Sequence, residues 1–174
     1  MESYVNLRMV MESKQLAIDA VKIIKSLASN QLPQSPNEIK HFIEDIVVSG
    51  NMVIVEESCS LYDTTFHILF KEIYKNVAKM LKKDAVSKGW YYDCVGPYEE
   101  SISARRIDDE LEITTVIAPN GNGICPECGE QVVCYAEYNP YEKYYCPNCG
   151  EELDHSDMFD GDCPETTKER FPIV

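Results

Sequence analysis

The sequence predicts an α+β fold: a mixed or antiparallel sheet of four to five strands, covered by about three helices and followed by a small C-terminal β-hairpin module. Three observations predict it. Apolar residues alternate with polar ones in some stretches, as in half-buried strands, and recur at helical spacing in others. Two Cys-x-x-Cys pairs follow the last of these stretches. The 174 residues, 44% of them hydrophobic, allow one main core plus a small module.

Hydrophobic periodicity gives the order of elements in the body. Ser13 is a candidate N-cap for the helix that follows it, and Ser35-Pro-Asn-Glu38 combines a capping box with proline at the first helical position. Asp108-Asp109 suits a hairpin turn. The expected strands cover 4–11, 52–55, 91–95, 102–106 and 111–117, and the expected helices run over 14–29, from 35 to about 46 and from 63 to about 83.

The two cysteine pairs are Cys125-Pro-Glu-Cys128-Gly and Cys146-Pro-Asn-Cys149-Gly. A Cys-x-x-Cys turn places two thiolates on one side of a tetrahedral zinc ion, and a second turn closes the other side. The glycine after each pair can adopt the positive φ that directs backbone N–H groups toward the sulfurs. Because four sulfur ligands fill the coordination shell, we expect one structural zinc ion with no open position for a substrate.

The expected zinc module contains two strands, 131–135 and 141–145, around the turn at Asn139-Pro140. Zinc binding contributes roughly 10–16 kcal/mol in comparable small modules, so the metal would supply most of its stability. Cys134, Cys163 and His155 lack the knuckle spacing and are not expected to be ligands. The expected organisation is an α/β body over 1–120, a zinc ribbon over 124–153 and an acidic C-terminal tail over 154–174.

The chain is strongly acidic, with 30 Asp and Glu against 16 Lys and Arg and a formal net charge of −14. Residues 125–174 hold twelve of the acids and three of the bases, a net of −9. The negative electrostatic field of these acids repels phosphate backbones and attracts basic clefts. Whether these acids form a surface array or a loose tail depends on whether residues 171–174 dock onto the body, which the sequence leaves open.

Several classes of protein are disfavoured. No apolar run approaches the length that spans a bilayer, and no N-terminal segment reads as a signal peptide, so we expect a soluble, cytoplasmic protein. The zinc spacing favours a reducing compartment over a disulfide scaffold. His41, His67 and His155 are scattered and pair with no nucleophile, and the sequence contains no phosphate-binding glycine loop. We therefore expect a protein without enzymatic activity.

Candidate partner-binding residues surround the second cysteine pair. Carboxylates on a rigid support can occupy the Lys/Arg groove of an enzyme that handles nucleic acid, and tyrosines are frequent anchors of protein interfaces. The acids can equally form a solvated tail, and the tyrosines can pack within the hairpin or stack on bases. The candidates are Glu151, Glu152, Asp154, Asp157, Asp160, Tyr138, Tyr141 and Tyr144.

The stretch from Cys125 to Leu153 resembles the zinc ribbons of bacterial and phage proteins, and the four ligands that this resemblance implies are Cys125, Cys128, Cys146 and Cys149. Ribbons serve DNA, RNA and protein recognition alike. The whole chain also resembles the small acidic inhibitors that phages direct against host defence, notably anti-CRISPR proteins. That resemblance implies a protein partner with a basic groove, such as a type II CRISPR effector nuclease in the bacterial cytosol, and inhibition by blocking its target DNA loading.

Two other functions remain open from the residues themselves. A zinc-ribbon protein that binds nucleic acid or regulates transcription would need a local basic and aromatic face strong enough to overcome the global charge. An enzyme would need an active site in the α/β body that no recognised sequence motif indicates.

Overall fold

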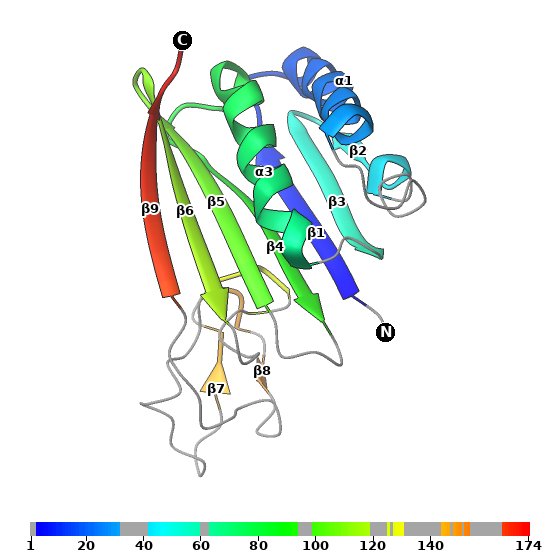
Figure 1. Cartoon of the computed structure of the whole chain (residues 1–174), viewed down its shortest axis with the longest axis vertical. Helices are drawn as coiled ribbons and strands as arrows, with labels where there is room; N and C mark the ends of the chain where they lie inside the picture. Colours follow the sequence, from blue (N-terminus) through cyan, green and yellow to red (C-terminus); the bar gives the residue numbers. More distant parts are fainter. Residues whose placement is uncertain are drawn as a thin grey trace.

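The computed structural model is α+β, with an antiparallel seven-stranded sheet and helices packed on one of its faces (Figure 1). It describes residues 3–31, 42–59, 63–93, 99–118, 125, 127–130, 144–146, 148–150, 152–153 and 165–174. The strands of the main sheet are β1 (Ser3–Val10), β2 (Val47–Ser49), β3 (Met52–Cys59), β4 (Val86–Asp93), β5 (Glu99–Ile107), β6 (Glu110–Ala118) and β9 (Glu165–Pro172), in the spatial order β2-β3-β1-β4-β5-β6-β9.

Helices α1 (Lys14–Gln31) and α3 (Asp63–Val77) lie side by side over the same face of this sheet, which we call the helix face (Figure 1). A 3-10 turn, Ala78–Met80, follows α3, and residues 42–44 form a further helical turn. A separate two-stranded ladder joins β7 (Tyr144–Tyr145) to β8 (Glu152–Leu153). None of the helices in the described ranges is long and apolar enough to cross a membrane.

The expected first strand and first helix are confirmed, and their burial shows why they form. Val5, Leu7 and Met9 are completely buried on the helix face, which is the alternation that a half-exposed strand requires. The Ser13 hydroxyl accepts a hydrogen bond from the backbone N–H of Leu16 at 3.2 Å and so caps the start of α1.

Helix α3 forms the centre of the core. Phe70 contacts the rings of Phe42 and Tyr74 edge-on, with centroids 5.9 and 6.3 Å apart. The buried Tyr74 hydroxyl donates to the carbonyl oxygen of Ile102 at 3.1 Å, which satisfies its polar group. The Phe70 ring also lies so close to Gly89 of β4 that a Cβ at that position would overlap it. Glycine is therefore required there by close approach between helix and sheet.

The expected count of four to five strands was too low, because β2 and β9 gave no clear signal. Strand β2 has only three residues. Strand β9 has the sequence Glu-Thr-Thr-Lys-Glu-Arg-Phe-Pro, which contains almost no apolar residues. Only Glu169 and Phe171 are partly buried, so the other positions do not require apolar side chains. The expected strand over 91–95 begins five residues earlier, at Val86. The hairpin turn at Asp108-Asp109 is confirmed, with Ile107 paired to Glu110 and Asp108 at φ 52°.

The expected acidic tail over 154–174 needs correction at residues 165–172, because these residues form the last strand of the main sheet. Glu169 forms an ion pair with Lys71 of α3, and the Lys75 ammonium lies 4.5 Å from the centroid of the Phe171 ring. Phe171 and Ile173 pack against the core. The C-terminal end of the chain thus docks onto the body. Residues 154–164, the rest of the expected tail, lie outside the described residues.

Candidate metal centre

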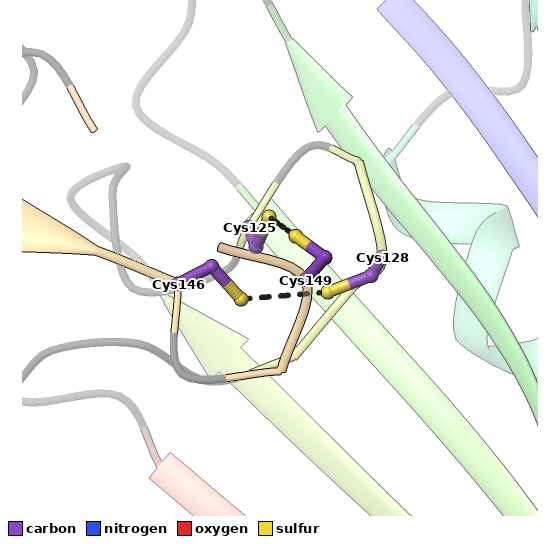
Figure 2. Close-up of side chains that lie close together, drawn as sticks. All are labelled: Cys125, Cys128, Cys146 and Cys149. Carbon is purple, nitrogen blue, oxygen red and sulfur yellow. Dashed lines mark hydrogen bonds between the residues drawn. The ribbon is translucent and has the colours of Figure 1, made fainter. Parts of the chain in front are cut away.

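The four predicted ligands come together in one cluster, as Figure 2 shows. The four sulfur atoms all lie within 4.8 Å of one another. Across the two knuckles, the Cys125 and Cys149 sulfurs are 3.5 Å apart, and so are those of Cys128 and Cys146. A tetrahedral site with zinc–sulfur bonds of about 2.3 Å has sulfur–sulfur edges of about 3.8 Å. The spacing of the four thiols therefore fits a zinc ion.

The two knuckles have the same backbone geometry. Gly129 donates its N–H to the Cys125 carbonyl oxygen and Gly150 donates its N–H to that of Cys146, each at 2.8 Å. The φ angles are 66° at Gly129 and 78° at Gly150, as the sequence predicts. Glycine adopts this left-handed conformation without the steric cost of a Cβ atom. The residue that follows the second cysteine therefore allows each knuckle to close around its two sulfurs.

The surroundings of Cys125, Cys128 and Cys146 shift the pKa values of these three thiols in different directions. Burial raises the pKa of Cys125 far above the usual thiol value and also raises the pKa of Cys128. At Cys146 the effect of burial is outweighed by the backbone N–H groups of Cys149 and Asn148, which lower its pKa to about 7. Without a cation, Cys125 and Cys128 stay protonated at neutral pH. A divalent ion reverses this preference, because it stabilises every coordinating thiolate.

The first knuckle is fixed to the sheet on the face opposite the helices, which we call the far face. Trp90 alternates along β4 with Gly89, which faces α3, so its ring projects onto the far face. Gly129 packs directly on this ring: a Cβ at Gly129 would lie 2.7–2.8 Å from Trp90 Cγ, Cβ and Cδ2. Beside it, Glu130 forms an ion pair with Lys88, whose side chain is 18% exposed.

The last three residues of the second knuckle face solvent. Asn148, Cys149 and Gly150 are exposed, and no atom outside the knuckle lies within 4 Å of a Cβ built at Gly150. Cys125 and Cys146, by contrast, are 0% and 1% exposed. The cluster therefore has an inner side against Trp90 and an outer side on the second knuckle. A metal ion held by all four sulfurs would tie this outer knuckle to the body.

The structure describes only part of the expected partner-binding surface. Glu152 lies in β8, where it pairs with Tyr145 of β7, and Tyr144 pairs with Leu153. Their side chains lie outside the described residues, as do the other expected residues, Tyr138, Tyr141, Glu151, Asp154, Asp157 and Asp160. The expected ribbon strand 131–135 also lies there, so the described partner of β7 is the segment after the second knuckle.

The histidines do not contribute to the described centre. His41 and His155 lie outside the described residues, and His67 lies in α3 with its side chain outside them. Cys134 and Cys163, which the spacing argument excludes as ligands, lie there too.

Sequence reasoning missed the residues that anchor the centre: Trp90, Lys88 and Glu130. One signal was present. Lys88 and Trp90 alternate with Gly89 and Tyr91, so a large aromatic residue occurs on the same strand face as a lysine. A tryptophan on the face opposite the helices needs another segment to pack on its ring and bury it. In the structure Trp90 is only 1% exposed.

The fold and the site together define an antiparallel α+β protein with a cluster of four cysteines that could hold a metal ion, packed on the far face of its sheet. No family model, no curated protein and no solved structure matches the chain.

Proposed function

We propose that the chain is a non-catalytic, zinc-stabilised binding protein whose acidic residues around the second knuckle contact a protein partner with a basic groove. The observation that supports it is the asymmetry of the cysteine cluster. The first knuckle is packed on Trp90, while the last three residues of the second are exposed and are followed at once by Glu151 and Glu152. Glu152 belongs to a ladder with Tyr145, the residue before Cys146.

The metal has a defined purpose in this proposal. Carboxylates bind a cationic groove more tightly when they are already held in place, because less conformational entropy is lost on binding. Zinc held by the four cysteines would link the backbone that carries Glu151 and Glu152 to the knuckle on Trp90. The protein would thus present negative charge from a fixed position at one end of the sheet.

The charge of the chain specifies the class of partner. Residues 125–174 have a net charge of −9, which favours encounter with surfaces that normally attract nucleic acid. An RNA-guided effector nuclease of the type II CRISPR class has such a channel. We propose that the protein acts as an inhibitor that occupies this channel and blocks loading of target DNA.

The test compares two matched charge reversals. The double variant Glu151→Lys/Glu152→Lys changes the proposed surface, and Glu44→Lys/Asp45→Lys changes the net charge equally at exposed residues before β2, at the opposite edge of the sheet from β9. Binding to the guide-loaded effector is measured by interferometry over a salt series, together with zinc content and melting temperature. We expect the first variant to bind at least about 10-fold more weakly, a loss of about 1.4 kcal/mol.

Three results would contradict the proposal. The first is that the unmodified protein fails to bind the effector. The second is that both variants weaken binding equally, which would indicate a non-specific charge effect. Binding that does not decrease with salt would also argue against an electrostatic contact. Zinc content and melting must be equal in the two variants for the comparison to concern the surface.

One observation favours the alternative of a nucleic-acid-binding protein. Strand register places five cations on the far face: Arg8, Lys88, Arg105, Lys168 and Arg170. Most of them are neutralised, because Lys88 pairs with Glu130 and Arg170 with Glu112 and Glu110, while Arg8 and Arg105 have acids at 4.0 Å. This function therefore ranks second, and binding of short oligonucleotides in the same salt series would move it to first.

A further inference from the structure

Strand β9 is an edge of the main sheet, and its outer side has no partner among the described residues. It pairs with β6 over eight successive residues, from Glu165 opposite Ile117 to Pro172 opposite Glu110. Six of its eight residues are exposed. An exposed edge strand presents a row of unpaired backbone N–H and C=O groups, which is a template for another strand.

The hydrogen bonds at the end of β9 show which groups point outward. Ile173 donates its N–H to the carbonyl oxygen of Asp109 at 2.8 Å, toward the β6 side. Because backbone groups alternate in direction with period two, Thr166, Lys168 and Arg170 direct both their N–H and C=O away from β6. Pro172 belongs to the same outward set, where its missing N–H breaks no bond to β6.

Ion pairs connect this edge strand to neighbouring elements on both faces of the sheet. On the helix face, Glu169 pairs with Lys71 of α3. On the far face, the Arg170 guanidinium donates to Glu112 Oε2 from Nη2 at 3.0 Å and from Nε at 3.2 Å. A partner strand would therefore meet a preorganised template and would not have to order β9 on binding.

The charges of β9 oppose pairing with a second copy of the same strand. A two-fold dimer with a continuous sheet needs antiparallel pairing that keeps each face in register. Every such register with four or more residue pairs sets like charges directly opposite each other: Glu165 against Glu169, or Lys168, Glu169 or Arg170 against itself. Like charges opposite each other destabilise a ladder.

We propose that β9 binds an extended peptide segment of another protein as an eighth, antiparallel strand. This mode supplies affinity from backbone hydrogen bonds and specificity from alternate side chains. The peptide would place carboxylates opposite Lys168 and Arg170 on the far face, and an apolar side chain opposite Phe171 on the helix face. The proposal is independent of the acidic surface around the second knuckle, since an acidic peptide is repelled by that surface.

The probe is the synthetic peptide acetyl-Thr-Val-Glu-Thr-Glu-Val-Thr-amide, titrated calorimetrically into the full-length zinc-loaded protein. Thr166→Pro removes one outward N–H and leaves the bonds to β6, whereas the matched control Thr166→Ala keeps that N–H. We expect binding to the unmodified protein and to Thr166→Ala, and at least a tenfold loss for Thr166→Pro. Lys168→Glu should weaken binding similarly. The peptide in which only the second glutamate, the one opposite residue 168, is replaced by lysine should bind this variant again.

A second peptide keeps the proposal testable if Thr166→Pro fails to fold. N-methylation of the two glutamate amides blocks the N–H groups that would face β9 and leaves both carboxylates in place, so it should abolish binding. Equal binding of the methylated peptide would overturn the proposal, as would absence of binding by the unmethylated one. A concentration-dependent dimer in sedimentation that Thr166→Pro dissociates would also overturn it, because the edge would then be occupied by a second copy.

Discussion

At the scale of single residues, Gly129 and Gly150 occupy equivalent positions but have different surroundings. Both adopt positive φ and both close a knuckle with the same 2.8 Å hydrogen bond. Gly129 is pressed against the Trp90 ring, whereas Gly150 is open to solvent. The pair thus separates two requirements: the conformation that a Cys-x-x-Cys-Gly turn needs, and the contact that docks this centre on the sheet.

Alanine substitutions at the two glycines should therefore differ in cost. Gly150→Ala introduces only the left-handed backbone strain of a non-glycine residue, about 1–2 kcal/mol. Gly129→Ala adds an overlap with Trp90, and overpacking of this kind costs typically about 1–3 kcal/mol more. Urea denaturation of the zinc-loaded proteins measures both, and the fluorescence of Trp90, the single tryptophan, should change in the Gly129 variant. Equal losses and unchanged emission would mean that the knuckle does not rest on Trp90.

At the scale of elements, local sequence patterns predict the strands and helices of the body. They do not predict the edge strands of the sheet or the packing of the first knuckle on it. The alternation at Val5, Leu7 and Met9 and the cap at Ser13 specify β1 and the start of α1 locally. Strand β9 has no such signal, because an edge strand needs only a neighbouring strand whose backbone groups on that side are unpaired. Its position depends on long-range contacts, such as Glu169 with Lys71, that no local pattern contains.

The same contrast holds for the metal centre. Spacing alone identified the cluster of Cys125, Cys128, Cys146 and Cys149, because the ligands of a tetrahedral ion need a tightly restricted local backbone. Spacing said nothing about which knuckle would be buried. That outcome depends on Trp90, which lies far away in the sequence and emerges on the far face only through the register of β4.

The contact between α3 and β4 provides a prediction at this scale. Gly89→Ala should be strongly destabilising, since its Cβ would overlap the Phe70 ring. Phe70→Leu should also lose stability, but it makes room for that methyl group, so the double variant should be more stable than the sum of the two losses predicts. A coupling of about 0.5–3 kcal/mol in a double-mutant cycle is typical of residues in contact. Strict additivity would show that the close approach of helix and sheet is absent in solution.

At the scale of the whole molecule, the metal state should change the pH range over which the cysteines affect stability. In the zinc-loaded protein the folded thiols are ionised, whereas unfolded thiols take up protons below about pH 8.5, so stability should rise with pH up to that value. In the metal-free protein the folded pKa values of Cys125 and Cys128 are raised by burial. Their contribution is complete below the unfolded thiol pKa and is lost as pH rises above it. Cys146 acts in the opposite direction, because its pKa is lowered to about 7 and it adds stability between that pH and the unfolded thiol pKa.

Chemical denaturation of both forms at pH values on either side of about 8.5 measures this difference. We expect the zinc-loaded protein to gain stability from acidic to mildly alkaline pH, and the metal-free protein to lose stability above that range. Parallel pH profiles for the two forms would indicate that the cysteines do not change their protonation when the metal binds.

The most direct test of the account is zinc K-edge X-ray absorption of the purified protein, with the metal content of the same sample. We predict one zinc ion per chain, with four sulfur neighbours at about 2.3 Å and no nitrogen or oxygen ligand. Two or three sulfurs with lighter atoms, or a protein that contains no zinc and has its cysteines in disulfides, would contradict the four-thiolate centre and the docking that depends on it.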